Sequence, residues 1–117
     1  MIEKIRIGNN EVTMKVTANT PRKYREIFGK DLFVDLQKFM AHINSKGELT
    51  SGFDFGVVER LGYTMALQAD GTIGTIDDWL DGFEGIDDVY GAMGEIIGLW
   101  NKSKTTTAEP KKKTAEQ

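Results

Sequence analysis

IRIGNNEVTMKV, the stretch from Ile5 to Val16, alternates apolar and polar side chains on both sides of a Gly-Asn-Asn-Glu turn. Such alternation places the apolar side chains of a β-strand on one face. Asparagine tolerates the positive φ angles that tight hairpin turns need. We therefore predict a β-hairpin over residues 3–17. A lone hairpin is only marginally stable in water, so its apolar face must pack against helices.

Outward from the hairpin, the spacing of apolar residues predicts five short helices, over residues 20–28, 31–44, 53–69, 75–83 and 86–101. The clearest apolar stripe belongs to the second of them and consists of Leu32, Phe33, Leu36, Phe39, Met40 and Ile43. Thr20-Pro21 and Asp31 are typical helix starts, and Gly29 is a typical helix end. The predicted fold class is therefore α+β, mainly α, with the hairpin packed on a bundle of about five helices.

The composition is that of a single globular domain, with 117 residues, 39% hydrophobic and 28% charged. We assign this domain to residues 1–102. Residues 103–117 carry no large apolar side chain, so we predict a flexible, disordered tail there. No run approaches the roughly 20 apolar residues of a membrane helix, and the N-terminus lacks the apolar stretch of a signal peptide. We expect a cytoplasmic protein that does not contact membranes.

Several classes of active site have no support in the residues. The chain has no cysteine and a single histidine, His42, so it cannot assemble a zinc site or a Cys-His nucleophile pair. The thirteen glycines are scattered and form no phosphate-binding loop. Residues 70–75 resemble the start of a calcium loop but lack its third and fifth carboxylates. We therefore predict neither catalysis nor a cofactor.

The charges are unevenly distributed along the chain. Residues 1–60 carry a net charge of +2, residues 61–101 carry −8, and residues 102–117 carry +3. The segment from Asp70 to Glu95 holds eight carboxylates and no lysine or arginine. Such a segment repels a phosphate backbone, which disfavours nucleic-acid binding. Two interpretations stay open, a solvated face that aids solubility and a docking surface for a basic partner.

Two pairs of adjacent carboxylates lie in the acidic segment, Asp77-Asp78 and Asp87-Asp88. Paired carboxylates can share a proton in acid–base catalysis, but adjacent residues on a helix do not face each other. Each pair also falls in the first turn of a predicted helix, where negative charge is favourable. Helix capping is therefore the favoured interpretation.

Three glycines, Gly91, Gly94 and Gly98, lie along one side of the last predicted helix. Each costs about 1 kcal/mol relative to alanine, so a close approach by another element is the natural explanation. We favour a helix of the same chain, or a merely loose helix, over a partner helix, because close packing within a domain is commoner than an exposed groove. The candidate partner-binding residues all lie on the last two predicted helices: Asp77, Asp78, Trp79, Asp81, Asp87, Asp88, Gly91, Gly94, Gly98 and Trp100.

The order of motifs resembles one known family. ANTPRKYREIFGKD, residues 18–31, looks like the start of tail assembly chaperones from long-tailed, siphovirus-like phages of Gram-positive bacteria. MALQAD at 65–70, IDDWLDGF at 76–83 and EIIGLWNK at 95–102 are similar to later parts of that family, as is the Thr-rich, PKKK-containing tail. The resemblance covers nearly the whole chain. The glycine content of the last helix departs from it.

The resemblance implies a chaperone that coats the tape measure protein, keeps it soluble and recruits tail tube subunits. It further implies a homo-oligomer that works in the host cytoplasm and is absent from the mature virion. The family often makes a frameshift-extended form, and Pro110 to Lys113 could be encoded by a slippery run. The alternatives are a structural tail or head-tail connector protein and a small nucleic-acid-binding regulator.

Overall fold

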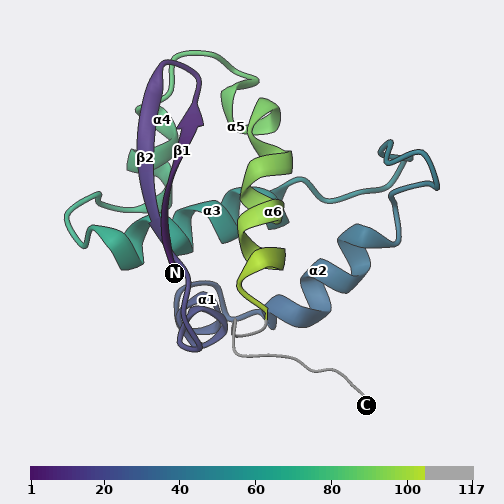
Figure 1. Cartoon of the computed structure of the whole chain (residues 1–117), viewed down its shortest axis with the longest axis horizontal. Coiled ribbons are helices and arrows are strands. Elements are labelled where there is room, and N and C mark those ends of the chain that lie inside the picture. The colour runs from purple at the N-terminus through teal and green to yellow at the C-terminus, as the bar shows by residue number, and fades with distance from the viewer. Residues whose placement is uncertain (105–117) are drawn as a thin grey trace.

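The structure, a computed structural model, describes residues 1–104. This part contains a two-stranded antiparallel sheet, β1 (Ile2–Ile7) and β2 (Asn10–Lys15). It also contains six helices: α1 (Thr20–Phe28), α2 (Leu32–Met40), α3 (Gly56–Ala69), α4 (Ile76–Asp81), α5 (Asp88–Gly91) and α6 (Met93–Lys102). The predicted hairpin on a mainly helical base is confirmed, as Figure 1 shows.

The hairpin presents the predicted apolar face to the helices. Ile5 lies opposite Val12, and Gly8 and Asn9 form a two-residue turn between paired Ile7 and Asn10. Gly8 has a φ of 61°, and a Cβ at this position would collide with the carboxylate of Asp88. The turn therefore needs glycine both for its backbone angle and for space. In Figure 1, α3 runs behind the hairpin, while α5 and α6 lie on the β1 side.

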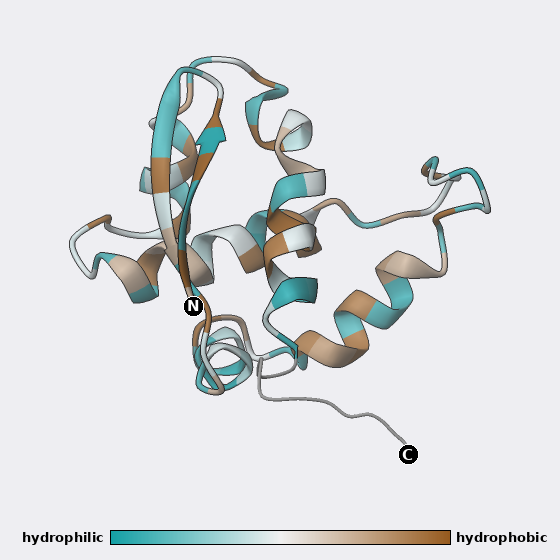
Figure 2. Ribbon diagram, in the orientation of Figure 1, coloured by the Kyte–Doolittle hydropathy of each residue, from teal (hydrophilic) through white to brown (hydrophobic). Residues whose placement is uncertain are grey.

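Helix α3 forms the centre of the hydrophobic core. Val58, Leu61 and Met65 are completely buried, and they pack with strand residues and with Ile96 of α6. Full burial of one such side chain contributes about 1.5–3 kcal/mol relative to its exposure. Figure 2 shows the hydrophobic residues concentrated where α3, α6 and the hairpin face one another. None of the helices within residues 1–104 is long and apolar enough to cross a membrane.

A polar cluster ties the first three helices together. The Tyr24 hydroxyl of α1 donates to Oδ2 of Asp35 on α2 at 2.7 Å, and Nε of Arg60 on α3 donates to the Tyr24 oxygen at 2.9 Å. Arg60 also pairs with Asp54, just before α3. Burial and the hydrogen bond to Asp35 raise the pKa of Tyr24. We call Tyr24, Asp35 and Arg60 the tyrosine–arginine cluster.

The second predicted helix, 31–44, is longer than the helix that the structure shows. Asp31 caps it as expected, accepting a hydrogen bond from the Val34 N–H, but α2 ends at Met40. Beyond it, Ile43 forms an isolated β-bridge with Leu49, and the Asn44 side chain accepts from backbone N–H groups of the same loop. These bonds satisfy backbone N–H groups of the loop without helical hydrogen bonds, and they compete with an extension of the helix.

The last predicted helix, 86–101, is divided in the structure. The first piece, α5, is only four residues long, and Ala92 separates it from α6 with non-helical backbone angles. The other predicted helices start or end within three residues of the observed ones: 53–69 begins at Gly56, and 75–83 is reduced to Ile76–Asp81. The predicted tail lies, from residue 105 on, outside the described residues.

Candidate partner-binding surface

An apolar trough of about 560 Å³ opens between the loop that precedes α3 and the segment that joins α4 to α5. Two carboxylates, Glu59 and Asp87, stand among its lining residues. The apolar lining, which we call the apolar trough, consists of Phe53, Phe55, Leu80, Phe83, Ile86, Val89 and Tyr90. It combines residues from two separate stretches of the chain, 53–59 and 80–90.

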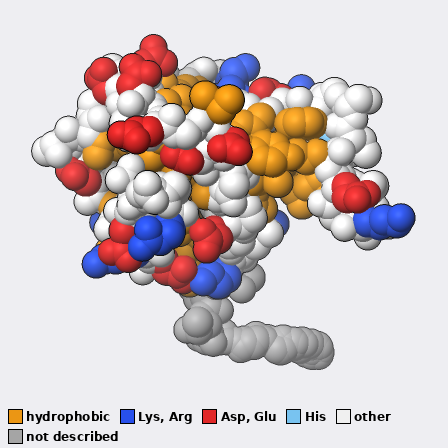
Figure 3. Space-filling model, turned by 90° about the horizontal axis from the view of Figure 1, so that it is seen from above, with side chains coloured by type: hydrophobic (Ala, Val, Ile, Leu, Met, Phe, Trp, Pro, Cys, Tyr) orange, Lys and Arg blue, Asp and Glu red, His pale blue; other side chains and the backbone are white. Residues whose placement is uncertain are grey.

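The residues at the mouth of the trough are unusually exposed for their size. Ile86 is 107% exposed relative to its reference state, and Tyr90 is 49% exposed. The Tyr90 ring lies against that of Phe55, with the ring centres 5.3 Å apart. Figure 3 shows hydrophobic side chains gathered on this face with acidic side chains beside them. An exposed apolar patch with a polar rim is typical of a protein-binding surface.

The carboxylates near the trough are without cationic partners in residues 1–104. All six ion pairs of this part involve residues outside the segment from Asp70 to Glu95. The segment itself contains no lysine or arginine, and the cations that share a hollow with Asp87 or Glu95, Arg6 and Lys102, form no ion pair with them. The face therefore attracts a basic partner and repels an acidic one.

One carboxylate of each predicted pair has a local structural task. The Thr75 hydroxyl accepts from the Asp78 N–H, while the Asp78 carboxylate accepts from the Thr75 N–H, which is a complete capping box. The Asp88 carboxylate accepts from the Gly85 N–H at 3.0 Å. Asp77, Asp81 and Asp87 are exposed, and Asp87 lines the apolar trough. The two members of each pair thus have different surroundings.

The two candidate tryptophans are buried. Trp79 is 8% exposed and packs against Tyr63 and Phe83, with ring centres 5.9 and 5.1 Å away. Trp100 is 6% exposed and lies edge-on against Phe33 of α2. Most of each indole therefore serves the internal packing of the chain.

The three candidate glycines face open space. A Cβ at Gly91, Gly94 or Gly98 would meet no atom of residues 1–104 within 4 Å, apart from the two residues adjacent in sequence and the nearby backbone of its own helix. Close packing by a helix of the same chain, one of the two explanations that we favour, is therefore wrong for residues 1–104, and a loose helix stays a prediction. Gly91 belongs to α5, whereas Gly94 and Gly98 belong to α6.

Sequence reasoning missed the residues that make the trough. The sequence predicts one continuous helix over 86–101, which includes Ile86 and Tyr90, and another that begins at Phe53. The signal that could have placed Ile86 in a loop is Gly85, followed three residues later by the capping carboxylate of Asp88. The position of Phe55 against Tyr90 depends on long-range packing, which has no local signal.

Comparisons with known proteins give no further assignment. No family model matches the chain, and neither a curated protein nor a solved structure matches it. Within residues 1–104, no three histidine, cysteine or acidic side chains come together as a potential metal site. The apolar trough and its unpaired carboxylates are thus the features on which a functional proposal can be built.

Proposed function

We propose that the chain binds another protein through the apolar trough, and that it serves as a tail assembly chaperone for a phage tape measure protein. The observation that carries the proposal is the complete exposure of Ile86 beside Tyr90, Phe53 and Phe55. Covering exposed apolar surface with a partner lowers the free energy by about 25 cal/mol per Å². The resemblance of the motifs between residues 18 and 102 supplies the identity of the client.

A chaperone of this kind needs no catalytic group. Its apolar trough covers a hydrophobic stretch of the client, while unpaired carboxylates such as Asp87 and Asp81 keep the complex soluble. An amphipathic client helix suits the trough, because its apolar side chains can enter while its basic side chains meet the rim. Salt should weaken such binding by screening the charges but should not abolish the apolar contact.

The wider role in the proposal follows the family resemblance. The chaperone would recruit tail tube subunits to the client, form homo-oligomers and act in the host cytoplasm, and it would be missing from mature virions. A frameshift-extended form would share the same trough. A structural connector protein, in contrast, would remain in the particle.

Co-expression with the tape measure protein of the same phage tests the proposal. We expect a large rise in soluble tape measure protein, and we expect Ile86→Ser to reduce that rise strongly. Ile2→Ser is the matched control, because Ile2 is 62% exposed and does not line the trough. Equal solubility with and without the wild-type chain would refute the chaperone role. Equal effects of the two variants would refute the trough as its binding surface.

A further inference from the structure

Strand β2 has a free backbone edge. Met1 and Val16 exchange two hydrogen bonds, from the Val16 N–H to the Met1 oxygen at 2.8 Å and from the Met1 amino group to the Val16 oxygen at 3.0 Å. Because bonded and non-bonded pairs alternate along an antiparallel ladder, the register makes Ile5 and Val12 a bonded pair as well. The N–H and C=O groups of Glu11, Thr13 and Lys15 therefore point away from β1.

The two edges of the hairpin differ in what lies beside them. The β1 edge faces α5 and α6, and Lys102 of α6 forms an ion pair with Glu3. Beside the β2 edge, the structure records no hydrogen bond from residues 1–104 to the outward backbone groups of Glu11, Thr13 and Lys15. An open edge of this kind can pair with another extended chain, which proteins usually prevent.

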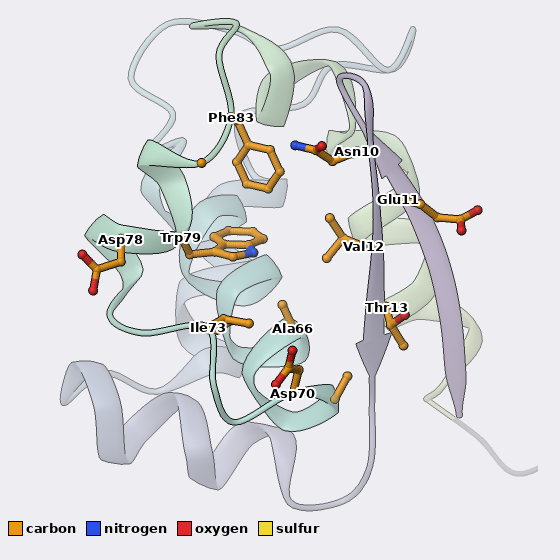
Figure 4. A pocket seen from close by; sticks show the side chains of 12 residues that line it. Asn10, Glu11, Val12, Thr13, Ala66, Asp70, Ile73, Asp78, Trp79 and Phe83 are labelled. Atoms are coloured by element: carbon orange, nitrogen blue, oxygen red, sulfur yellow. The ribbon is translucent and has the colours of Figure 1, made fainter.

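A hollow of about 650 Å³ lies under this free edge, between β2 and α4. Its apolar walls include Val12 of β2, Ile73, Trp79 and Phe83. In Figure 4, Val12 points across the hollow toward Trp79, whereas Glu11 points away from it. The hairpin thus leaves three apolar side chains at the hollow only half-buried, Val12, Ile73 and Phe83.

The polar groups around the hollow indicate what it can accept. The indole nitrogen of Trp79 faces the hollow in Figure 4, and no hydrogen bond joins it to another residue of the described part. Asp70 and Asp78 stand among the lining residues, and Glu11 lies on the exposed face of β2. On that face Glu11 pairs with Lys4 at 3.7 Å. The lining of the hollow itself holds three carboxylates and no lysine or arginine, so a segment that carries lysine or arginine is complementary to it in charge.

We propose that β2 binds an extended, basic segment of a partner protein as a third, antiparallel strand of the sheet. The outward groups of Glu11, Thr13 and Lys15 pair with the backbone of that segment. Its inward side chains, which alternate along the strand, are apolar and cover the half-buried Val12, Ile73 and Phe83. A basic residue of the segment lies opposite Glu11 and shares this exposed carboxylate with Lys4. The site is recognised by backbone pairing and goes beyond the helix-binding trough of the proposed function.

A second copy of the chain fits this edge less well. If the β2 strands of two copies paired about a two-fold axis normal to the sheet, both sets of α3 and α4 would lie on the same side. The helices of each copy would then need the space beneath the β2 strand of the other copy. That space already holds the α3 helix of the other copy. A single extended segment has no helical layer of its own and avoids this conflict.

Backbone amide exchange by NMR, on the full chain at low concentration, tests the proposal with the synthetic peptide KVEVTVKVK as probe. Its alternating valines face the hollow, and its glutamate, threonine and third-from-last lysine fall opposite Lys15, Thr13 and Glu11. We expect the amides of these three residues to exchange about tenfold more slowly with the peptide, with no change at Lys4 and Arg6. A peptide that is N-methylated at the three opposing residues keeps the side chains but loses the donors, and it should give no protection.

A pair of proline variants sharpens the test. Thr13→Pro removes an outward N–H of β2 and leaves the bonds between β1 and β2 intact, so peptide affinity should fall at least about tenfold. Lys4→Pro makes the same change on the paired residue of β1 and should leave peptide affinity unchanged. If Thr13→Pro fails to fold, the binding of the unmodified and N-methylated peptides to the wild-type chain still tests whether the β2 edge is the site.

Three results would overturn the proposal. The first is equal binding of the N-methylated and unmodified peptides, or no protection by either. The second is protection of Glu11 and Thr13 without peptide that rises with protein concentration, because a second copy would then occupy the edge. The third is protection without peptide that disappears when the chain is truncated after Lys104, because the chain's own C-terminal residues would then be the occupant.

Discussion

The tyrosine–arginine cluster and the apolar trough use charged groups in opposite ways. The cluster pairs its charges, and Arg60 and Asp35 are each largely buried, with side chains 17% and 16% exposed. At the trough, Asp81 and Asp87 are exposed and unpaired within residues 1–104, and Asp87 shares the trough lining with an isoleucine that is wholly exposed. The first arrangement holds three helices together. The second contributes little to the fold and leaves an exposed apolar surface, which we propose as the binding site for a partner.

This difference separates residues that matter for stability from residues that matter for a partner. A buried charge that loses its counterpart destabilises the protein strongly, whereas a change at an exposed, unpaired residue is nearly neutral for folding. The following substitutions test the separation by the free energy of unfolding, from the largest expected change to the smallest.

Arg60→Ala should destabilise the fold by about 3 kcal/mol, because it leaves Asp35 and the Tyr24 hydroxyl buried without their cation. Urea unfolding followed by tryptophan fluorescence measures the change. Arg22→Ala is the matched control, since the Arg22–Glu26 pair is exposed and contributes at most about 0.5 kcal/mol. Similar losses for both variants would show that the cluster is not a special tie between α1, α2 and α3.

Tyr24→Phe should change how stability depends on pH. Burial raises the pKa of Tyr24 above the value of about 10 in the unfolded chain. Above that value the unfolded chain releases a proton that the folded protein still holds, so stability is present below pH 10 and falls as the pH rises. The wild type should lose about 1.4 kcal/mol at pH 11 relative to the variant. Parallel pH profiles of the two proteins, from urea unfolding between pH 8 and 11, would contradict the assignment.

Asp78→Ala should cost about 1 kcal/mol, because it removes half of the capping box with Thr75. Asp77→Ala, its neighbour, should change the unfolding free energy by only a few tenths of a kcal/mol, since the structure records no side-chain hydrogen bond for it. Thermal unfolding of the two variants in parallel gives the comparison. A larger loss for Asp77→Ala would reverse the roles assigned to the pair.

Ile86→Ser should leave the unfolding free energy within about 0.5 kcal/mol of the wild type, because the side chain is fully exposed. Leu61→Ala is the internal reference, and the loss of this buried side chain should cost about 2–5 kcal/mol. Chemical unfolding curves distinguish the two cases readily. If Ile86→Ser proves strongly destabilising, Ile86 belongs to the core and the apolar trough is not open.

Local patterns carried most of the fold. The alternation around Gly8 was enough to place both strands and their buried face, and Thr20-Pro21 and Gly29 marked the ends of α1 correctly. Helix capping, the interpretation favoured for the pair Asp77-Asp78, is confirmed for Asp78, which forms a capping box with Thr75. Each of these features depends on residues within a few positions of one another.

The remaining features depend on contacts between distant residues. The end of α2 is decided by the bridge between Ile43 and Leu49, and the helical spacing continues past the true end. The break at Ala92 lies inside an unbroken apolar pattern. The residues of the candidate site were the hardest to predict from the sequence. The trough depends on contact between Phe55 and Tyr90, which are 35 positions apart in the chain. The two tryptophans that the sequence suggested as binding residues are buried.

The central claim, that the apolar trough is the surface offered to a client, is tested most directly by photo-crosslinking. A photoreactive amino acid placed at position 86 or at position 2 replaces an exposed isoleucine in each case. In cells that also produce the tape measure protein, we predict a crosslink to it from position 86 and none from position 2. A crosslink from position 2 alone, or from neither position while the two proteins co-purify, would contradict the account.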